Sequence, residues 1–113
     1  MAVKRDLRSS ERISINREFR SIEELVSEYV TNISRTGVFI RSETPLPVGT
    51  KVNLKFSIIM DEIESVEGLG EVVRVVDEGA EPHGMGVVFS HLDGRSAQLV
   101  DRIVGWVSGT GAP

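Results

Sequence analysis

The sequence contains no cysteine, few aromatic residues and no long apolar segment. Without cysteine the chain forms no disulfide, no thiolate nucleophile and no cysteine-based zinc site. A membrane-spanning helix needs about 18 consecutive apolar residues, and no window approaches this, so we expect no membrane insertion. No apolar run follows the charged residues 1–6, so they do not resemble a secretory signal. These absences favour a small soluble domain, and the lack of cysteine is typical of the cytoplasm.

Positive charge is scarce outside the first 20 residues. Residues 1–20 hold six of the 13 Lys/Arg and three of the 17 Asp/Glu, which leaves seven and 14 for residues 21–113. General binding of DNA or RNA needs a broad positive surface, so we do not expect it. A locally basic segment can hold a compact anionic ligand through a few arginines, although a solvated basic tail has the same composition.

The apolar pattern has a period of two over most of the 113 residues, which indicates short strands. Strands are expected over 13–20, 26–33, 38–41, 52–58, 61–76 and 85–89. Between the first two, Ser21 followed by acids predicts a brief helical turn. Residues 44–50 and 77–84 read as loops because they are rich in proline and glycine.

The last segment changes to helical spacing, with apolar residues three and four apart over 99–107. Asp93 or Ser96 is suited to cap this helix, and Gly109 to end it. Short strands followed by one helix predict a single, mainly β domain: a small six-stranded antiparallel β-barrel with a C-terminal α-helix.

Two short motifs carry residue types suited to a small anionic ligand. Arg8 and Arg12 are four residues apart, and ten arginines in 113 residues produce roughly one such pair by chance. Asn32, Ser34 and Gly37 follow the second strand, where any turn also prefers these residue types. Guanidinium groups bind phosphates, and short amide and hydroxyl groups hydrogen-bond a base edge. The order of the two motifs therefore says more than either motif alone.

In this order, Arg8-x-x-x-Arg12 and Asn32-x-Ser34-x-x-Gly37 resemble the two-part signature of PilZ domains, which are bacterial receptors for cyclic di-GMP. The resemblance covers roughly residues 5–107 and includes four further stretches: 32–41, 45–50, 70–74 and 84–89. The amino-acid sequences of these stretches are similar to those of the PilZ variant of myxobacteria and related deltaproteobacteria. The resemblance implies a PilZ-type barrel over residues 13–109 and a flexible basic arm over residues 1–12.

The resemblance also implies a role for each residue of the two motifs. Arg8 and Arg12 would grip the phosphates of cyclic di-GMP and lie against its guanine, while Asn32 and Ser34 would hydrogen-bond a guanine edge or a phosphate. Gly37 would keep the site open, with its backbone at positive φ. The arm would wrap onto the barrel around the ligand, a transition from disorder to order.

Leu7 stands where many family members carry another arginine before the pair. A leucine cannot engage a second, stacked ligand, so we expect one cyclic di-GMP per domain. Some PilZ domains have lost the nucleotide and act through protein contacts, so a motility or regulatory adaptor is the alternative function. An RNA-binding barrel is disfavoured by the acidic body and the scarcity of aromatic residues.

Other functions find little support in the residue types. Ser34 has no histidine partner in the pattern, so we expect no enzyme. The two histidines, His83 and His91, are not clustered with carboxylates, so we expect no metal and no cofactor besides the ligand. A domain of this kind must act on an effector protein in trans, whose identity stays open. Trp106 is a core residue or part of a homodimer interface.

Overall fold

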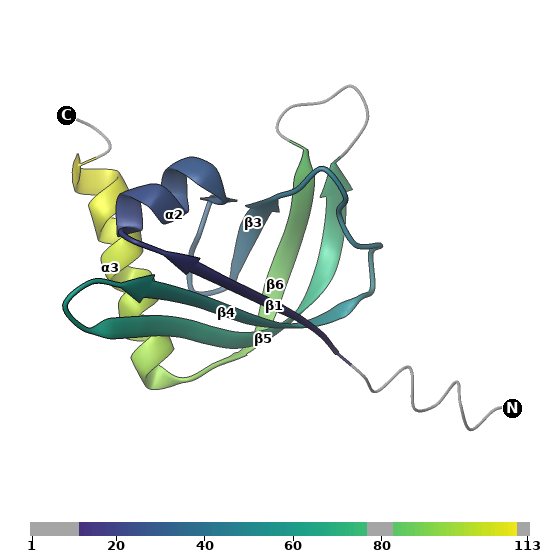
Figure 1. Ribbon diagram of the computed structural model, residues 1–113. Coiled ribbons are helices and arrows are strands. Elements are labelled where there is room, and N and C mark those ends of the chain that lie inside the picture. Colours follow the sequence, from purple (N-terminus) through teal and green to yellow (C-terminus); the bar gives the residue numbers. More distant parts are fainter. Residues whose placement is uncertain (1–11, 77–82, 111–113) are drawn as a thin grey trace, which may run out of the picture.

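The computed structural model describes residues 12–76 and 83–110, which form a curled β-sheet and two helices (Figure 1). In chain order the elements are β1 (Ile13–Phe19), α2 (Ile22–Glu28), β2 (Val30–Thr31), β3 (Gly37–Arg41), β4 (Lys51–Ile59), β5 (Ile63–Val76), β6 (Gly84–Leu92) and α3 (Gly94–Thr110). The strand order across the sheet is β1-β4-β5-β6-β3-β2. The predicted fold class, six strands with a C-terminal helix, is confirmed. The barrel is a half-barrel, because β1 and β2 are the two edges of the sheet and do not pair with each other in the described residues.

Four of the five strand pairings are antiparallel, but β1 and β4 run parallel. The sheet is therefore mixed, where we expected a purely antiparallel one. Parallel neighbours need a long crossover, and the chain between β1 and β4 supplies it with α2, β2 and β3. Turn signals between consecutive strands do not reveal such a crossover, so they give no information on the direction of β1.

The predicted strand over residues 26–33 is wrong for its first half, which continues α2. The Ser21 hydroxyl accepts a hydrogen bond from the Glu24 amide at 3.0 Å, and the Glu24 carboxylate accepts one from the Arg20 amide at 2.6 Å. This reciprocal pair resembles a capping box, which stabilises the start of a helix. The helix consequently runs to Glu28, and the strand shrinks to β2. Capping outweighs the β propensity of the valine and tyrosine that follow.

The helix predicted from the helical spacing of residues 99–107 is confirmed, and α3 extends beyond this apolar stretch at both ends. Asp93 caps it, because the Ser96 amide donates to Asp93 Oδ1 at 2.8 Å, and this bond lowers the pKa of Asp93. The Ser96 hydroxyl instead accepts from the Glu67 amide at 2.8 Å and so ties α3 to β5. Gly109 does not end the helix, which continues to Thr110. The described parts of the chain hold no helix long and apolar enough to cross a membrane.

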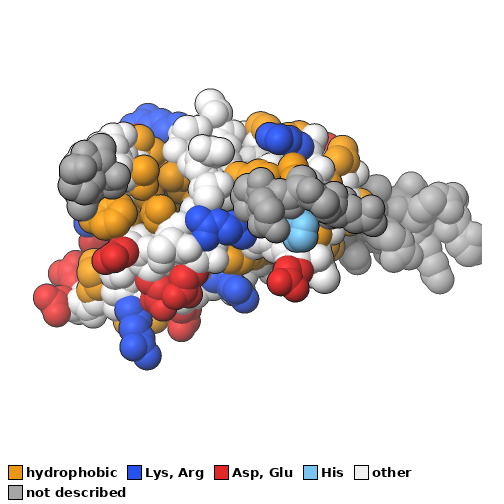
Figure 2. Space-filling model, turned by 90° about the horizontal axis from the view of Figure 1, so that it is seen from above, with side chains coloured by type: hydrophobic (Ala, Val, Ile, Leu, Met, Phe, Trp, Pro, Cys, Tyr) orange, Lys and Arg blue, Asp and Glu red, His pale blue; other side chains and the backbone are white. Residues whose placement is uncertain are grey.

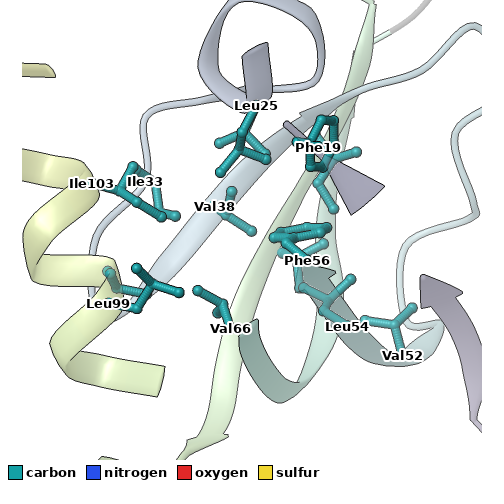
Figure 3. Packing of buried hydrophobic residues seen from close by; sticks show 14 of the residues in the cluster. Phe19, Leu25, Ile33, Val38, Val52, Leu54, Phe56, Val66, Leu99 and Ile103 are labelled. Atoms are coloured by element: carbon teal, nitrogen blue, oxygen red, sulfur yellow. The ribbon is translucent and has the colours of Figure 1, made fainter. Parts of the chain in front are cut away.

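The hydrophobic core lies between the concave face of the sheet and the helices α2 and α3. Figure 3 shows side chains from the strands and from both helices pointing into one cluster. Four alternate residues of β4 are at most 1% exposed: Val52, Leu54, Phe56 and Ile58. The Tyr29 ring packs against Phe19 and Phe56, with centroid distances of 5.8 and 5.7 Å. This aromatic group joins the end of β1 to the middle of β4.

Candidate functional site

The segment Asn32–Gly37, here called the signature turn, connects β2 to β3. Asn32 has a φ of 50°, in the left-handed region that a short amide side chain tolerates better than most. The following residue, Ile33, is 9% exposed and belongs to the core cluster. The left-handed residue therefore turns the chain so that Ile33 enters the core while the Asn32 side chain stays exposed.

Ser34 closes the signature turn through hydrogen bonds with its neighbours. Its amide donates to the Gly37 carbonyl at 2.9 Å, and its hydroxyl accepts from the Thr36 amide at 3.2 Å. The Ser34 and Thr36 hydroxyls also lie 2.9 Å apart. Both residues are exposed, so this turn closed by hydrogen bonds lies at the surface of the molecule. Such side-chain bonds to the local backbone are typical of serine and threonine in turns.

Gly37 is needed for a reason other than the one we expected. Among the described residues, positive φ occurs at Asn32 and at Gly49, and not at Gly37. A Cβ atom on Gly37 would instead lie 2.5 Å from the Val87 carbonyl oxygen of β6. The glycine therefore allows β3 and β6 to approach closely where the signature turn enters the sheet.

Arg12 lies at the beginning of β1 with its side chain held on the sheet. Its Nη1 atom donates to the carbonyl of Val52 at 2.9 Å and to that of Gly70 at 3.2 Å. These bonds fasten the start of β1 to both β4 and β5. Arg8 and Leu7 lie outside the described residues, as does the rest of the predicted arm.

Arg12 and the signature turn lie in the same row across the sheet. The row runs from Ile13, next to Arg12, through Val52, Gly70 and Phe89, whose amide donates to the Thr36 carbonyl at 2.9 Å. Neighbouring strands lie about 4.8 Å apart, so the strands of this row span on the order of 19 Å along the curved sheet. The fold thus aligns the second arginine with the turn, although 20 or more residues separate them in sequence.

The sequence reasoning missed one charged pair at the signature turn. Arg35 forms a bidentate pair with Asp101 of α3, with Nε–Oδ1 at 2.9 Å and Nη2–Oδ2 at 2.5 Å. The hydrogen bond from Arg35 lowers the pKa of Asp101, and the same bond raises the pKa of Arg35. The two residues are 66 positions apart, so no local signal in the sequence connects them.

An apolar groove of about 430 Å³ lies between β2 and the end of α3, and Asn32 is one of the residues that line it. Aliphatic side chains line most of it: Val26, Val30, Ile33, Val104 and Val107, together with Thr31, Asn32 and Ser108. Figure 2 shows hydrophobic side chains near the end of the molecule where α3 ends, with charged side chains beside them. The groove adds apolar surface next to the signature turn and contributes no charged group.

Comparison with protein families matches residues 6–106 to the PilZ domain. No curated protein matches the chain. The matched segment includes the arginine pair, the signature turn and all six strands of the sheet. The match therefore covers most of the chain and both motifs, and the chain belongs to the PilZ domain family.

Proposed function

We propose that this PilZ domain is a receptor for cyclic di-GMP that couples the level of this second messenger to a partner protein. The observation that carries the proposal is the row that joins Arg12 to the signature turn. A guanidinium group at one end of a row and exposed amide and hydroxyl groups at the other suit a ligand with phosphates and purine edges. The family to which the chain belongs supports the same ligand.

Each motif residue has a distinct proposed role. Arg8 and Arg12 bind the phosphates and lie against a guanine, and Asn32 and Ser34 hydrogen-bond a guanine edge or a phosphate. Arg12 then binds the ligand beside the carbonyl groups of Val52 and Gly70, which accept hydrogen bonds from its guanidinium group. Gly37 acts indirectly, because it lets β3 approach β6 and so places the signature turn.

Leu7 supports a stoichiometry of one ligand per domain, because its aliphatic side chain offers no donor to a second phosphate. We further propose that the domain belongs to the PilZ variant of myxobacteria and related deltaproteobacteria. In this proposal it works in the cytoplasm, without catalysis, through an effector protein in trans.

Titration calorimetry with cyclic di-GMP tests the receptor function on the wild type and on Arg8→Ala and Arg12→Ala. A charge-assisted hydrogen bond contributes about 1.5–3 kcal/mol, so each variant should bind roughly 10- to 100-fold more weakly. Arg20→Ala is the matched control, because it removes one exposed positive charge from the same basic segment. Circular dichroism on Arg12→Ala separates lost binding from lost structure.

Equal binding by the wild type and both variants would remove the proposed arginine roles. A folded wild type that does not bind cyclic di-GMP at all would remove the receptor function.

The alternative function, a PilZ adaptor that binds protein and no nucleotide, is favoured by apolar side chains at the turn between β4 and β5. Ile59, Met60 and Ile63 are 39%, 52% and 68% exposed, within five residues of one another. Exposed apolar groups gathered in this way are typical of protein interfaces. Thermal unfolding distinguishes the two functions, since a ligand at 100 times its Kd adds about 2.7 kcal/mol to stability. No change with cyclic di-GMP would favour the adaptor.

A further inference from the structure

The Arg35 side chain makes none of the hydrogen bonds that close the signature turn. The Ser34–Gly37 and Thr36–Ser34 hydrogen bonds close this turn, and Ile33 anchors it in the core. The Arg35 side chain instead leaves the turn and reaches α3, where its guanidinium group binds both carboxylate oxygens of Asp101. Within residues 12–76 and 83–110, these are the only side-chain hydrogen bonds that join the signature turn to α3.

The Arg35–Asp101 ion pair is exposed to solvent, so another anion can replace Asp101 at the guanidinium group of Arg35. The side chains of Arg35 and Asp101 are 60% and 50% exposed, so water and dissolved anions reach both groups. Exposed ion pairs contribute little to stability, because solvent screens them. The planar guanidinium group binds a phosphate in the same bidentate way as a carboxylate. A phosphate brought next to Ser34 would therefore compete with Asp101 for the same donors.

We propose that Arg35 is a further ligand-binding residue, which exchanges Asp101 for a phosphate oxygen of the ligand when the signature turn is occupied. The inference rests on the proposed function and deepens it. In the structure Asp101 accepts both hydrogen bonds from the guanidinium group of Arg35, and Arg35 directly follows Ser34 in the signature turn. When the ligand binds, Arg35 turns from α3 to the phosphate, and α3 loses its hydrogen-bonded contact with the signature turn.

Calorimetry with cyclic di-GMP on two single variants tests the exchange, because the two changes have opposite expected signs. Arg35→Ala removes a phosphate donor and should weaken binding about five- to tenfold. Asp101→Asn removes the competitor and should strengthen binding about two- to fivefold. Glu64→Gln is the matched control: Glu64 of β5 pairs with Arg102, which follows Asp101 on α3, and neither residue belongs to the signature turn. This control removes one negative charge and should leave the affinity unchanged.

Each other outcome has a clear meaning. If Arg35→Ala and Asp101→Asn both weaken binding, the pair only positions the signature turn, and the exchange is wrong. If Asp101→Asn and Glu64→Gln act equally, the effect is one of total charge, and the exchange is also wrong. A wild type that does not bind cyclic di-GMP overturns the proposed function itself, together with this inference. A wild type that binds while Arg35→Ala binds equally well overturns the inference alone.

A charge-swapped variant provides an independent test. Arg35→Asp combined with Asp101→Arg keeps opposite charges across the pair but places a carboxylate in the signature turn. If the pair only positions the turn, the swapped variant should bind cyclic di-GMP nearly as well as the wild type. If Arg35 contacts the phosphate, the swapped variant should lose at least as much affinity as Arg35→Ala. Both residues are exposed, and circular dichroism checks that the swapped variant folds.

Discussion

The neighbouring strands β1 and β4 differ in what holds them in place. They pair residue for residue from Ile13–Val52 to Phe19–Ile58, so they share one register. Every alternate side chain of β4 from Val52 to Ile58 is buried, whereas in β1 only Phe19 is buried. Both strands have an alternating apolar pattern, but β1 lies at the sheet edge and β4 inside it. The core therefore fixes β4, while backbone pairing, Arg12 and Phe19 fix β1.

A similar difference distinguishes the two motifs of the family signature, the signature turn and the arginine pair. The signature turn is held by a buried isoleucine, by its own hydrogen bonds and by the close approach of Gly37 to β6. Arg12 lies where the weakly buried edge strand begins. The firmly held half offers a preformed surface, and the weakly held half carries the arginine that we propose binds the phosphates of the ligand. This division suits the proposed receptor function, in which residues 1–12 would close over the ligand.

The comparison breaks most clearly when one apolar side chain is truncated in each of the two strands. Leu54→Ala in β4 removes a side chain that is 1% exposed and should cost about 2–5 kcal/mol of unfolding free energy. Ile13→Ala in β1 removes a side chain that is 46% exposed and should change stability by about 0.5 kcal/mol or less. Urea unfolding measures both values. Equal costs would mean that the core holds β1 as firmly as β4.

The firmly held half is tested at Gly37. Gly37→Ala places a methyl group against the Val87 carbonyl, which forces β3 and β6 apart and should cost about 1–3 kcal/mol. Gly105→Ala on α3 is the control, because nothing lies within 4 Å of the added carbon, and it should stabilise by about 0.5–1 kcal/mol. Thermal unfolding compares the two variants. A Gly37→Ala variant as stable as the wild type would show that β6 can move away from β3 without strain.

The weakly held half is tested at Arg12 in the absence of ligand. Arg12→Ala removes two hydrogen bonds to carbonyl groups and should lower global stability by about 1 kcal/mol. Its larger effect should be local: amide hydrogen exchange should become faster at Ile13 and Ile15 and stay unchanged at Leu54. Uniform acceleration over β1 and β4 would contradict a local role for Arg12.

The smallest expected effect is the pH dependence of the Arg35–Asp101 pair. The pKa of Asp101 is lowered in the folded state, so this carboxylate adds stability above its unfolded pKa of about 3.9. That contribution is lost as the pH falls through the lower, folded pKa. The difference in Tm between the wild type and Asp101→Asn should therefore be present at neutral pH and vanish in strong acid. A difference that persists in acid, or that salt does not reduce, would contradict an ionic origin.

The sequence was sufficient to predict the features that depend on local periodicity. The alternation in residues 52–58 predicts β4, the helical spacing in 99–107 predicts α3, and the motif spacing marks the signature turn. Features that depend on distant contacts were not predictable. The parallel direction of β1 depends on a crossover through three other elements. The reason for Gly37 depends on the backbone of β6, and the partner of Arg35 lies on the last helix.

The position of β1 beside β4 also covers one side of a long strand that other chains would otherwise be able to pair with. β4 is a nine-residue strand, and without β1 one of its sides would present unpaired N–H and C=O groups to solvent. Long, regular, uncovered edges pair with strands of other chains. β1 has seven residues, and four of its five exposed residues are polar: Ser14, Asn16, Arg17 and Glu18. A chain shortened past Phe19 should therefore lose Arg12, the proposed phosphate-binding arginine, and also become prone to self-association through β4.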